Sequence, residues 1–503
     1  MLIANFQRNK FCALMFFLSV LLFLGSFCGV SQENSMKPNI VFILADDLGW
    51  ADLGCYGNTF NDTPEIDKLA ESGILFKQAY AAAPVCSPYR AALLTGQYPV
   101  KTGILDYLRP NDEALSTKHI SLAKILQRKG YATGMIGKWH LTGYAYEGAK
   151  EEVRAVDHGF DEELVSEIKG VGNGANFYPY VFRDQPISWL NVKDKKLQGS
   201  EYLTDRINYE AVSFIEKNKN KPFFLYVSHF ATHSILNGKK ALVEKYRKKH
   251  NPGKSTRENC YLCQDQGLAG DPCNHWAGSY NPHLAAMLES IDDGVGLIME
   301  KLKALGLSEN TIVVFTSDNG GEAPNVTSNM PLRGGKSQLY EGGIRVPMIV
   351  HWPNKIKAST VSNQLTTNMD FYPTFINATG IIPDPKQKLD GVSILNVLGN
   401  SDITMKRDPF YWHYPLEKPH FLGGSSAGAI RKDNWKLIEF FDENRLELFN
   451  LAEDMSETND VSEQHPKKVN ELYKQLSKWR TDVDATIPEN QHYVFKNNKL
   501  INQ

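Results

Sequence analysis

The chain has 503 residues, of which 42% are hydrophobic and 22% are charged. This composition is that of a globular protein, and it excludes a disordered chain, a collagen-like chain and a chain with many membrane spans. The 55 Lys and Arg residues are balanced by 57 Asp and Glu residues, so the net charge at pH 7 is −2. Nucleic-acid binding is therefore not expected, because it needs an excess of basic groups against the phosphate backbone.

The first thirty residues have the pattern of an export signal. Arg8 and Lys10 precede an apolar run over residues 11–24, and small residues lead to a cleavage site before Gln32. The run is shorter than the ~20 apolar residues of a spanning helix. We therefore predict that residues 1–31 are a signal peptide and that the protein is exported, to the periplasm or outside the cell, without a stable membrane span. An uncleaved anchor is the alternative.

Five of the seven cysteines lie after Gln32, and an odd number leaves at least one thiol unpaired in an exported protein. Three of the five, Cys260, Cys263 and Cys273, crowd one loop-like stretch. Disulfide pairing is the expected state there in an oxidising compartment. A zinc site that also uses His275 is the alternative, because the spacing resembles that of metal ligands.

Apolar runs rich in β-branched residues predict buried strands. Amphipathic stretches between these runs predict helices, and strands that alternate with helices predict an α/β sheet covered on both faces. The strands are predicted over Asn39 to Ala45, Tyr131 to Ile136, Phe223 to His229, Thr311 to Ser317 and Val346 to His351. The helices are predicted over Ser121 to Lys129, Asp205 to Asn218 and Leu284 to Leu305.

After Asp390 the pattern changes to short strands separated by turn-rich segments. A closing amphipathic helix is predicted over Lys467 to Thr481. We expect a main α/β domain over residues 37–395 and a C-terminal α+β subdomain with a short antiparallel sheet over residues 405–490, packed on the main domain. Its strands are predicted over Phe410 to Tyr414, Ala429 to Arg431, Trp435 to Phe440 and Leu446 to Leu448.

Polar side chains follow two of the predicted strands directly. Asp46 and Asp47 follow the strand that ends at Ala45, and Asp318 and Asn319 follow the strand that ends at Ser317. Ligands of open α/β sheets bind outside the carboxyl ends of the strands. Oxygen side chains that meet there suit a hard divalent cation such as Ca²⁺ or Mg²⁺. Each segment alone is also typical of a plain turn, but two of them after apolar strands favour a metal site.

Cys86 is followed by Pro88, Arg90 and a run of helix formers, so it is predicted to lie near a helix N-terminus beside a guanidinium group. Both features lower the pKa of a thiol. The alternative is a buried small hydrophobic residue. A thiolate beside an oxygen-ligated hard cation is chemically unusual, and the mismatch disappears if the sulfur is replaced by oxygen.

These segments together resemble the formylglycine-dependent sulfatases of the alkaline phosphatase superfamily, in which this cysteine is oxidised to Cα-formylglycine before the protein folds. The similarity extends from about Lys37 to about Trp479, nearly the whole mature chain. The ordered motifs that carry it are Asp46-Asp47, Cys86-Ser87-Pro88-Tyr89-Arg90 with Leu94-Thr95-Gly96, Gly137-Lys138-Trp139-His140, Ser317-Asp318-Asn319-Gly320, Gly334-Gly335-Lys336 and Tyr340 to Pro347.

The resemblance implies an alkaline phosphatase-like fold, with a large mixed, mostly parallel sheet between helices. It also implies one Ca²⁺ per chain and a maturing enzyme that makes the formylglycine. The implied ligands of the Ca²⁺ are Asp46, Asp47, Asp318, Asn319 and the residue derived from Cys86.

The remaining roles that the resemblance implies concern the sulfate group and the nucleophile. Arg90 would orient the formylglycine hydrate, and His140 would act as its base. Lys138 and Lys336 would bind the sulfate oxygens. His233 would bind sulfate or assist the leaving group, and it is preferred over the nearby His229. One hydroxyl of the hydrate would attack sulfur, and the second would allow sulfate to be expelled.

An exported sulfatase is expected to act on sulfated polysaccharides or oligosaccharides, of the algal or glycosaminoglycan type. His413 is a candidate substrate-binding residue, and Trp412 beside it is a candidate for stacking on sugar rings, with core packing as the alternative for this segment. The nearest rival function is that of a phosphodiesterase or phosphonate monoester hydrolase of the same superfamily. A glycan-binding protein without activity and a structural metal-binding protein are two more distant rivals.

Overall fold

The structure is a computed structural model in which Met1–Lys37 and Pro38–Gln503 form two separate compact units. It describes residues 37–109, 112–142, 153–169, 174–181, 188–189, 192, 194–249, 278–324, 326–443, 445–487, 493–496 and 499–502. The predicted signal peptide and the stretch that holds Cys260, Cys263 and Cys273 lie outside these residues, and all the described helices and strands belong to the second unit. Within the described residues, no helix combines the length and the apolar character that a membrane span requires.

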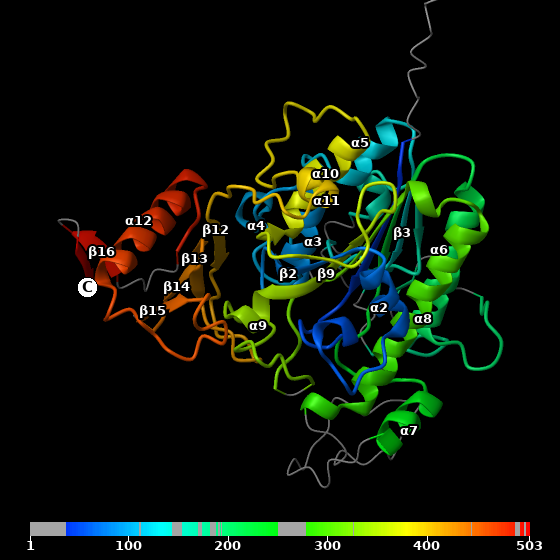
Figure 1. The fold of residues 1–503 in the computed structure, drawn as a ribbon, viewed down its shortest axis with the longest axis horizontal. Helices are drawn as coiled ribbons and strands as arrows, with labels where there is room; N and C mark the ends of the chain where they lie inside the picture. The colour runs from blue at the N-terminus through cyan, green and yellow to red at the C-terminus, as the bar shows by residue number, and fades with distance from the viewer. Residues whose placement is uncertain are drawn as a thin grey trace, which may run out of the picture. The chain divides into compact units, whose positions relative to one another are not determined.

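A nine-stranded mixed sheet forms the centre of the described chain (Figure 1). β9 is antiparallel to β2 and β8, and the other neighbouring strands of the sheet pair in parallel. The strand order is β10 (Thr360–Ser362), β2 (Ile74–Tyr80), β9 (Arg345–His351), β8 (Thr311–Ser317), β1 (Asn39–Ala45), β7 (Phe223–Ser228), β3 (Ala132–Gly137) and β4 (Glu162–Leu164), with β11 (Thr366–Thr367) beside β2.

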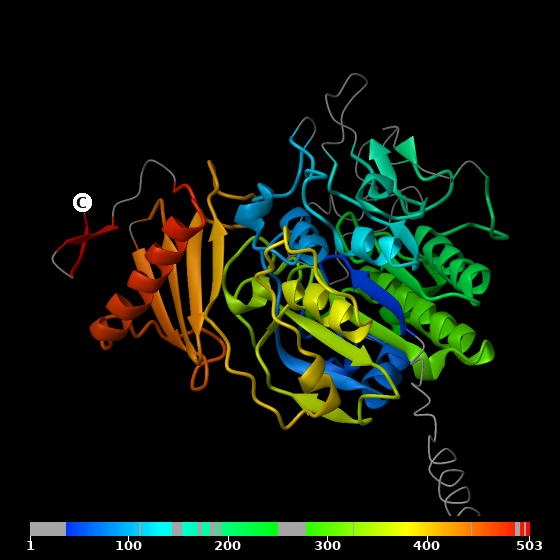
Figure 2. The ribbon, with the colours of Figure 1, turned by 90° about the horizontal axis from the view of Figure 1, so that it is seen from above.

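Helices cover both faces of this sheet, because the side chains of its buried strands alternate between two hydrophobic cores (Figure 2). In β1, Val41 and Ile43 belong to one core, whereas Ile40, Phe42 and Leu44 belong to the other. The first core is covered by α2 (Pro64–Glu71), α6 (Leu203–Asn218) and α8 (Pro282–Ala304), and the second by α3 (Cys86–Thr95), α5 (Leu122–Arg128) and α10 (Phe371–Ala378).

Shorter elements connect these layers. They are η1 (Gly54–Tyr56), α4 (Pro99–Thr102), η2 (Ala155–His158), the β5 (Glu167–Lys169) and β6 (Ser188–Trp189) pair, α7 (Lys240–Lys249), η4 (Gly278–Tyr280), η5 (Ser308–Asn310), α9 (Glu341–Ile344), η6 (Asn368–Asp370) and α11 (Leu395–Gly399).

The C-terminal part contains a four-stranded antiparallel sheet of β12 (Phe410–Tyr414), β13 (Ala427–Lys432), β14 (Trp435–Phe440) and β15 (Arg445–Asn450). One face of this sheet packs on α12 (Pro466–Asp482). The other face shares a hydrophobic core with Tyr80, Val85 and Ile344 of the preceding α/β part of the chain. A two-stranded sheet of β16 (Tyr493–Lys496) and β17 (Lys499–Asn502) follows.

The predicted fold class is confirmed, and the predicted strands and helices lie within two residues of the observed ones. The sequence reasoning missed β2, which lies between β10 and β9. Its apolar run is interrupted by Lys77 and Gln78, which are half-buried. The pattern therefore lacks the continuous apolar character by which the other buried strands were recognised.

Candidate active site

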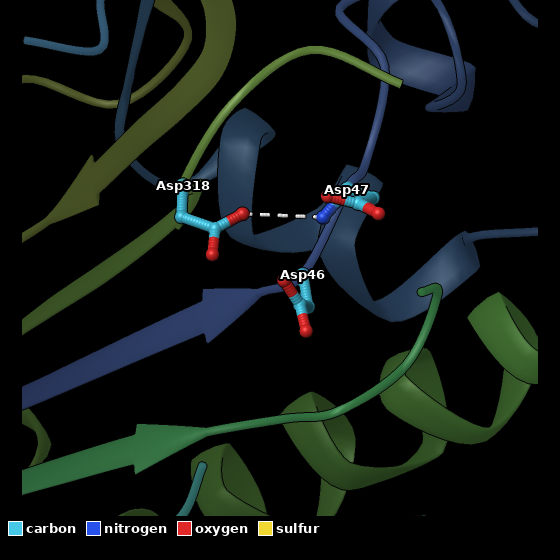
Figure 3. A group of neighbouring side chains, drawn as sticks. All are labelled: Asp46, Asp47 and Asp318. Atoms are coloured by element: carbon cyan, nitrogen blue, oxygen red, sulfur yellow. Dashed lines mark hydrogen bonds between the residues drawn. The ribbon is translucent and has the colours of Figure 1, made fainter. Parts of the chain in front are cut away.

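The polar residues at the ends of β1 and β8 meet, as predicted. The two strands are parallel and in register, with Ala45 opposite Ser317, so the residues that follow them leave the sheet at the same edge. Asp46, Asp47 and Asp318 each place one carboxylate oxygen within 4.8 Å of the others (Figure 3). The group is buried and can hold a metal ion.

The donor atoms of this group fit a hard cation. Asp46 Oδ1 and Asn319 Oδ1 are buried and have no hydrogen-bond partner among the described residues. Buried polar atoms are normally satisfied, so these two oxygens are suited to act as ligands of a cation. All the oxygens come from carboxylate or amide groups, which are the ligands that Ca²⁺ and Mg²⁺ prefer.

The electrostatics of the cluster point the same way. Burial, and then the neighbouring carboxylate of Asp46, raise the pKa of Asp318. Burial also opposes ionisation of Asp47, but the positive charges of Lys336 and Lys138 and the hydrogen bond from Lys336 outweigh it and hold the Asp47 pKa well below its ordinary value. A bound divalent cation would favour the ionised form of both carboxylates.

Cys86 is the first residue of α3 and is buried beside His140, with 3.2 Å between its Sγ and the His140 Nδ1. The prediction of a lowered thiol pKa is wrong. Burial raises the pKa of the Cys86 thiol to about 11 and outweighs the charges of Lys138 and Lys336. As an unmodified side chain, Cys86 is therefore a poor nucleophile at neutral pH.

The Arg90 guanidinium is paired with a carboxylate. Its Nη2 donates to Asp318 Oδ2 at 2.7 Å, and its Nη1 donates to the Lys138 carbonyl at 2.9 Å and to Ser228 Oγ at 2.5 Å. The fully buried guanidinium thus ties α3 to the carboxyl ends of β3, β7 and β8.

The two lysines contact the aspartates of the cluster. Lys138 Nζ donates to Asp46 Oδ2 at 2.6 Å, and Lys336 Nζ donates to Asp47 Oδ2 at 2.7 Å. Both ammonium groups are buried, and the aspartates raise the pKa of both lysines against the opposing effect of burial. Two cations thus lie around the cluster, where they can neutralise an anionic group.

His140 is held as a neutral base. Its Nε2 lies 3.1 Å from the Leu108 carbonyl oxygen. A carbonyl oxygen can only accept a hydrogen bond, so Nε2 carries the proton of the neutral ring, and the unprotonated Nδ1 faces the Cys86 sulfur. Burial, together with the charges of Lys138 and Arg90, lowers its pKa well below the ordinary value.

Glu167 positions this histidine and was missed by the sequence reasoning. Its carboxylate is buried and accepts the backbone N–H of Trp139 at 3.1 Å and that of His140 at 2.7 Å. The backbone of His140 is in the left-handed region (φ 51°), which is strained for a residue other than glycine. No motif in the sequence marks Glu167, because its role depends on the contact of the first residue of β5 with the backbone of Trp139 and His140.

Of the two histidines after β7, His233 lies next to the carboxylate cluster, and it is the one that the sequence analysis preferred over His229. Its Nε2 lies 2.8 Å from Lys336 Nζ and 3.5 Å from Asp47 Oδ2. Burial and the charge of Lys336 lower its pKa to about 3, so the ring is neutral. His229 is fully buried, and its Nδ1 has no hydrogen-bond partner in the described part of the chain.

The structure places His413 and Trp412 in the packing of the C-terminal sheet. His413 Nε2 lies 2.7 Å from the Thr486 carbonyl, and its ring lies against Phe441. Trp412 is buried, and its Nε1 donates to the Ala81 carbonyl at 2.8 Å. The expectation that Trp412 stacks on a sugar is therefore wrong, and the core-packing alternative holds, because this face of the C-terminal sheet is covered by the main part of the chain.

Comparisons with known proteins agree with this geometry. The chain matches the family model described as Sulfatase over residues 38–381, and the model described as N-sulphoglucosamine sulphohydrolase, C-terminal, over residues 335–483. It is 33% identical over 420 residues to the N-acetylgalactosamine-6-sulfatase of Canis lupus familiaris, over 78% of this chain and 72% of that protein. It is 29% identical over 523 residues to the N-acetylgalactosamine-6-O-sulfatase of Bacteroides thetaiotaomicron, over 89% and 94% of the two chains.

Solved structures share the fold. The crystal structure of Ps i-CgsB superposes with a TM-score of 0.73 and 31% sequence identity, and covers 89% of this chain and 93% of that one. Ps i-CgsB is also known in complex with k-i-k-neocarrahexaose. The phosphonate monoester hydrolase of Agrobacterium radiobacter is 18% identical with a TM-score of 0.65, over 93% of this chain and all of that one, which shows a common fold only.

Proposed function

The chain belongs to the sulfatase family and is a sulfuric ester hydrolase, and from this premise we propose that it removes sulfate esters from sulfated polysaccharides or oligosaccharides. The observation that carries the proposal is the position of Cys86, buried between His140 and a cluster of carboxylates that can hold a metal ion. A high thiol pKa at this point supports a modified side chain, because the unmodified thiol would be inert.

We propose that Cys86 is oxidised to Cα-formylglycine by a maturing enzyme and that Asp46, Asp47, Asp318 and Asn319 hold one Ca²⁺ together with the modified residue. When bound, these groups would supply an oxygen nucleophile and a positive charge against the sulfate oxygens. Their fit rests on the unsatisfied oxygens of Asp46 and Asn319.

The chain's own side chains have separate tasks in this proposal. The unprotonated Nδ1 of His140 takes a proton from the nucleophile, because it faces position 86. Lys138 and Lys336 lie beside the aspartates of the cluster, where their ammonium groups would bind the sulfate oxygens. Arg90 keeps Asp318 and α3 in place. His233 lies beside Lys336, where it binds sulfate or assists the leaving alcohol.

The relatives support a substrate class. Two of them are named for the 6-sulfate of N-acetylgalactosamine, and a structural neighbour binds a carrageenan oligosaccharide. We propose a sulfated carbohydrate of the glycosaminoglycan or algal type as the substrate. Export to the periplasm or outside the cell, with a signal peptide over residues 1–31, would bring the enzyme to such polymers.

The deciding experiment measures free sulfate released from a panel of sulfated mono- and oligosaccharides. The panel includes 6-sulfated N-acetylgalactosamine and carrageenan oligosaccharides, and 4-nitrophenyl sulfate serves as a general ester. Cys86→Ala should abolish release from all of them, and mass spectrometry of the peptide with position 86 should find formylglycine in the active enzyme. Full activity with an unoxidised cysteine would refute the proposed nucleophile.

A second experiment tests the rival function of a phosphodiesterase or phosphonate monoester hydrolase. Matched aryl esters of sulfate, phosphate diesters and phosphonate are compared at equal concentration. The proposed function requires kcat/KM to be highest for sulfate. A higher value for a phosphate diester or a phosphonate would assign the chain to the rival activity.

A further inference from the structure

Two loops that are far apart in the sequence border the reaction centre. The first includes Leu108, whose carbonyl faces His140 Nε2 at 3.1 Å and whose N–H donates to Ser87 Oγ at 3.0 Å. Ser87 follows the nucleophile position directly, so Tyr107 and Arg109, the neighbours of Leu108 in the chain, lie close to position 86.

The second loop joins β12 to β13 and packs on the segment that holds Lys336. Gln338 Nε2 donates to the Gly423 carbonyl at 3.1 Å. Gly424 approaches Ser337 so closely that a Cβ there would lie 2.1 Å from the Ser337 carbonyl oxygen. The loop is therefore fixed beside the catalytic lysine, and the charges of Lys336 and Asp47 both act on the pKa of its His420.

Aromatic side chains from the two loops form one surface, which we call the aromatic rim and define as Tyr107, His420 and Phe421. The ring centroids of Tyr107 and His420 are 5.5 Å apart, and those of His420 and Phe421 are 4.5 Å apart in a stacked arrangement. Phe421 is 76% exposed, so it contributes little to the core. Exposed aromatic residues beside a site often contact a ligand.

The hydrogen bonds of His420 leave one donor for a ligand. Its Nδ1 accepts the backbone N–H of Leu422 at 3.2 Å, which places the proton of the neutral ring on Nε2. Burial lowers the His420 pKa, so the ring is neutral at neutral pH. Among the described residues, the structure gives Nε2 no hydrogen-bond partner. A neutral N–H donor between two aromatic rings suits an uncharged oxygen.

Hydrogen bonds of Asp106 hold the first loop in place. Asp106 accepts the hydroxyl of Tyr414 at 2.9 Å and a guanidinium N–H of Arg109 at 2.7 Å. The Arg109 guanidinium lies over the Tyr107 ring at 4.3 Å. The Tyr107 ring therefore has a fixed orientation before any ligand binds, which lowers the entropy cost of binding.

We propose that the aromatic rim binds the sugar ring that carries the scissile sulfate. Phe421 and Tyr107 pack against the apolar C–H face of a pyranose, and His420 donates from Nε2 to a hydroxyl or N-acyl oxygen of that ring. This inference rests on the proposed function and adds to it the part of the site that recognises carbohydrate rather than sulfate.

The test compares a sugar ester with an aryl ester in the full-length, matured enzyme. His420→Phe keeps an aromatic ring and removes the Nε2 donor together with the Nδ1 acceptor of the Leu422 N–H, and Phe421→Ala removes the exposed ring. Tyr209→Ala is the matched control, because Tyr209 is an exposed aromatic residue on α6. The kcat/KM values are measured with 6-sulfated N-acetylgalactosamine and with 4-nitrophenyl sulfate.

Loss of one neutral hydrogen bond to a ligand costs about five- to tenfold in affinity. We therefore expect His420→Phe to lower kcat/KM for the sugar ester about five- to tenfold more than for the aryl ester, mainly through KM. Phe421→Ala should also act on KM for the sugar, and Tyr209→Ala should change neither value. Equal losses for both esters, or no loss, would overturn the inference. If the parent enzyme releases no sulfate from any ester, the proposed function fails instead.

Discussion

At the scale of single residues, the site is a set of buried charges that neutralise one another. Lys336 pairs with Asp47, Lys138 with Asp46 and Arg90 with Asp318, and all six are almost inaccessible to water. Removing one partner of such a pair leaves an unpaired charge in a medium of low dielectric constant, which costs about 3–5 kcal/mol. Substitutions at these positions therefore change both stability and chemistry.

Metal removal tests the carboxylate cluster. We expect a chelator such as EDTA to abolish sulfate release and to lower the melting temperature, and added Ca²⁺ to restore both, because the unsatisfied oxygens of Asp46 and Asn319 lose their partner. Asp46→Asn keeps the shape but removes a charge, so it should weaken Ca²⁺ binding in titration calorimetry. Full activity in metal-free protein would contradict the assignment.

Glu167→Gln tests the positioning of His140. A glutamine offers one acceptor oxygen in place of two, so one of the N–H groups of Trp139 and His140 loses its partner. We expect kcat to fall about ten- to a hundredfold with little change in KM, because a small displacement of a catalytic group is costly. Glu162→Gln is the control, since its carboxylate pairs with Lys217 near the surface. A pure rise in KM would argue against a positioning role.

At the scale of elements, one helix supplies the cap of another. Thr63, the residue before α2, makes no side-chain capping bond. Asp292 of α8 takes its place and accepts the N–H of Glu65 at 3.0 Å and that of Ile66 at 2.8 Å. The carboxylate also lies at the positive end of the α2 dipole. The contact fixes the angle between two helices on the same face of the sheet.

Removing this cap should destabilise the protein without touching the site. We expect Asp292→Ala to lower the free energy of unfolding by about 1–2 kcal/mol, because two backbone donors of α2 lose their acceptor. Urea unfolding followed by circular dichroism measures this change. A variant as stable as the parent would show that water replaces the cap at no cost.

The pH dependence of the same residue has a defined sign. Burial raises the Asp292 pKa from 3.8 to about 7 in the folded state. The Asp292 carboxyl group therefore binds its proton more tightly in the folded protein than in the unfolded chain. As the pH rises from 3.8 to about 7, the free energy of unfolding of the parent falls relative to that of Asp292→Asn. Unfolding curves of both proteins should show that the free energy of unfolding of the variant, relative to that of the parent, is higher at pH 8 than at pH 5. A constant difference would contradict the shift.

At the scale of the whole described chain, a buried ionic network connects the C-terminal sheet to the central one. Lys436 of β14 donates to Glu341 of α9 at 3.0 Å and lies 2.8 Å from Glu457, and all three are fully buried. Tyr80 of β2 also donates to Glu341 at 2.5 Å. The network therefore fixes the C-terminal sheet against α9 and β2.

Lys436→Met tests this network. It removes the cation that pairs with buried Glu457, whereas Glu341 keeps Arg345 at 3.3 Å and Arg431 at 3.8 Å. Because a buried charge loses its partner, we expect a loss of about 3–5 kcal/mol in the free energy of unfolding. Lys432→Met is the matched control, because Lys432 pairs with Glu471 at the partly exposed surface and should cost less than about 1 kcal/mol. Differential scanning calorimetry separates the two outcomes. Equal melting temperatures for the two variants would mean that the network contributes specificity of packing rather than stability.

The amino-acid sequence by itself determined the central strands and the edge at which the chemistry lies. Continuous apolar runs such as Asn39–Ala45 and Thr311–Ser317 specify buried strands locally, and the acids that follow each run must leave the sheet at its carboxyl edge. The start of a helix at Cys86 is local in the same way. These properties depend on residues that are close in sequence, so a pattern of residue types is enough to predict them.

Only the tertiary structure decided how the site groups act on one another. The high thiol pKa of Cys86 depends on how deeply α3 is buried, and the role of Glu167 depends on a strand that begins 27 residues after His140. The packing of Trp412 and the aromatic rim depend on loops more than 300 residues apart. Burial and distance between remote residues set pKa values and contacts, and neither quantity is written in the local sequence pattern.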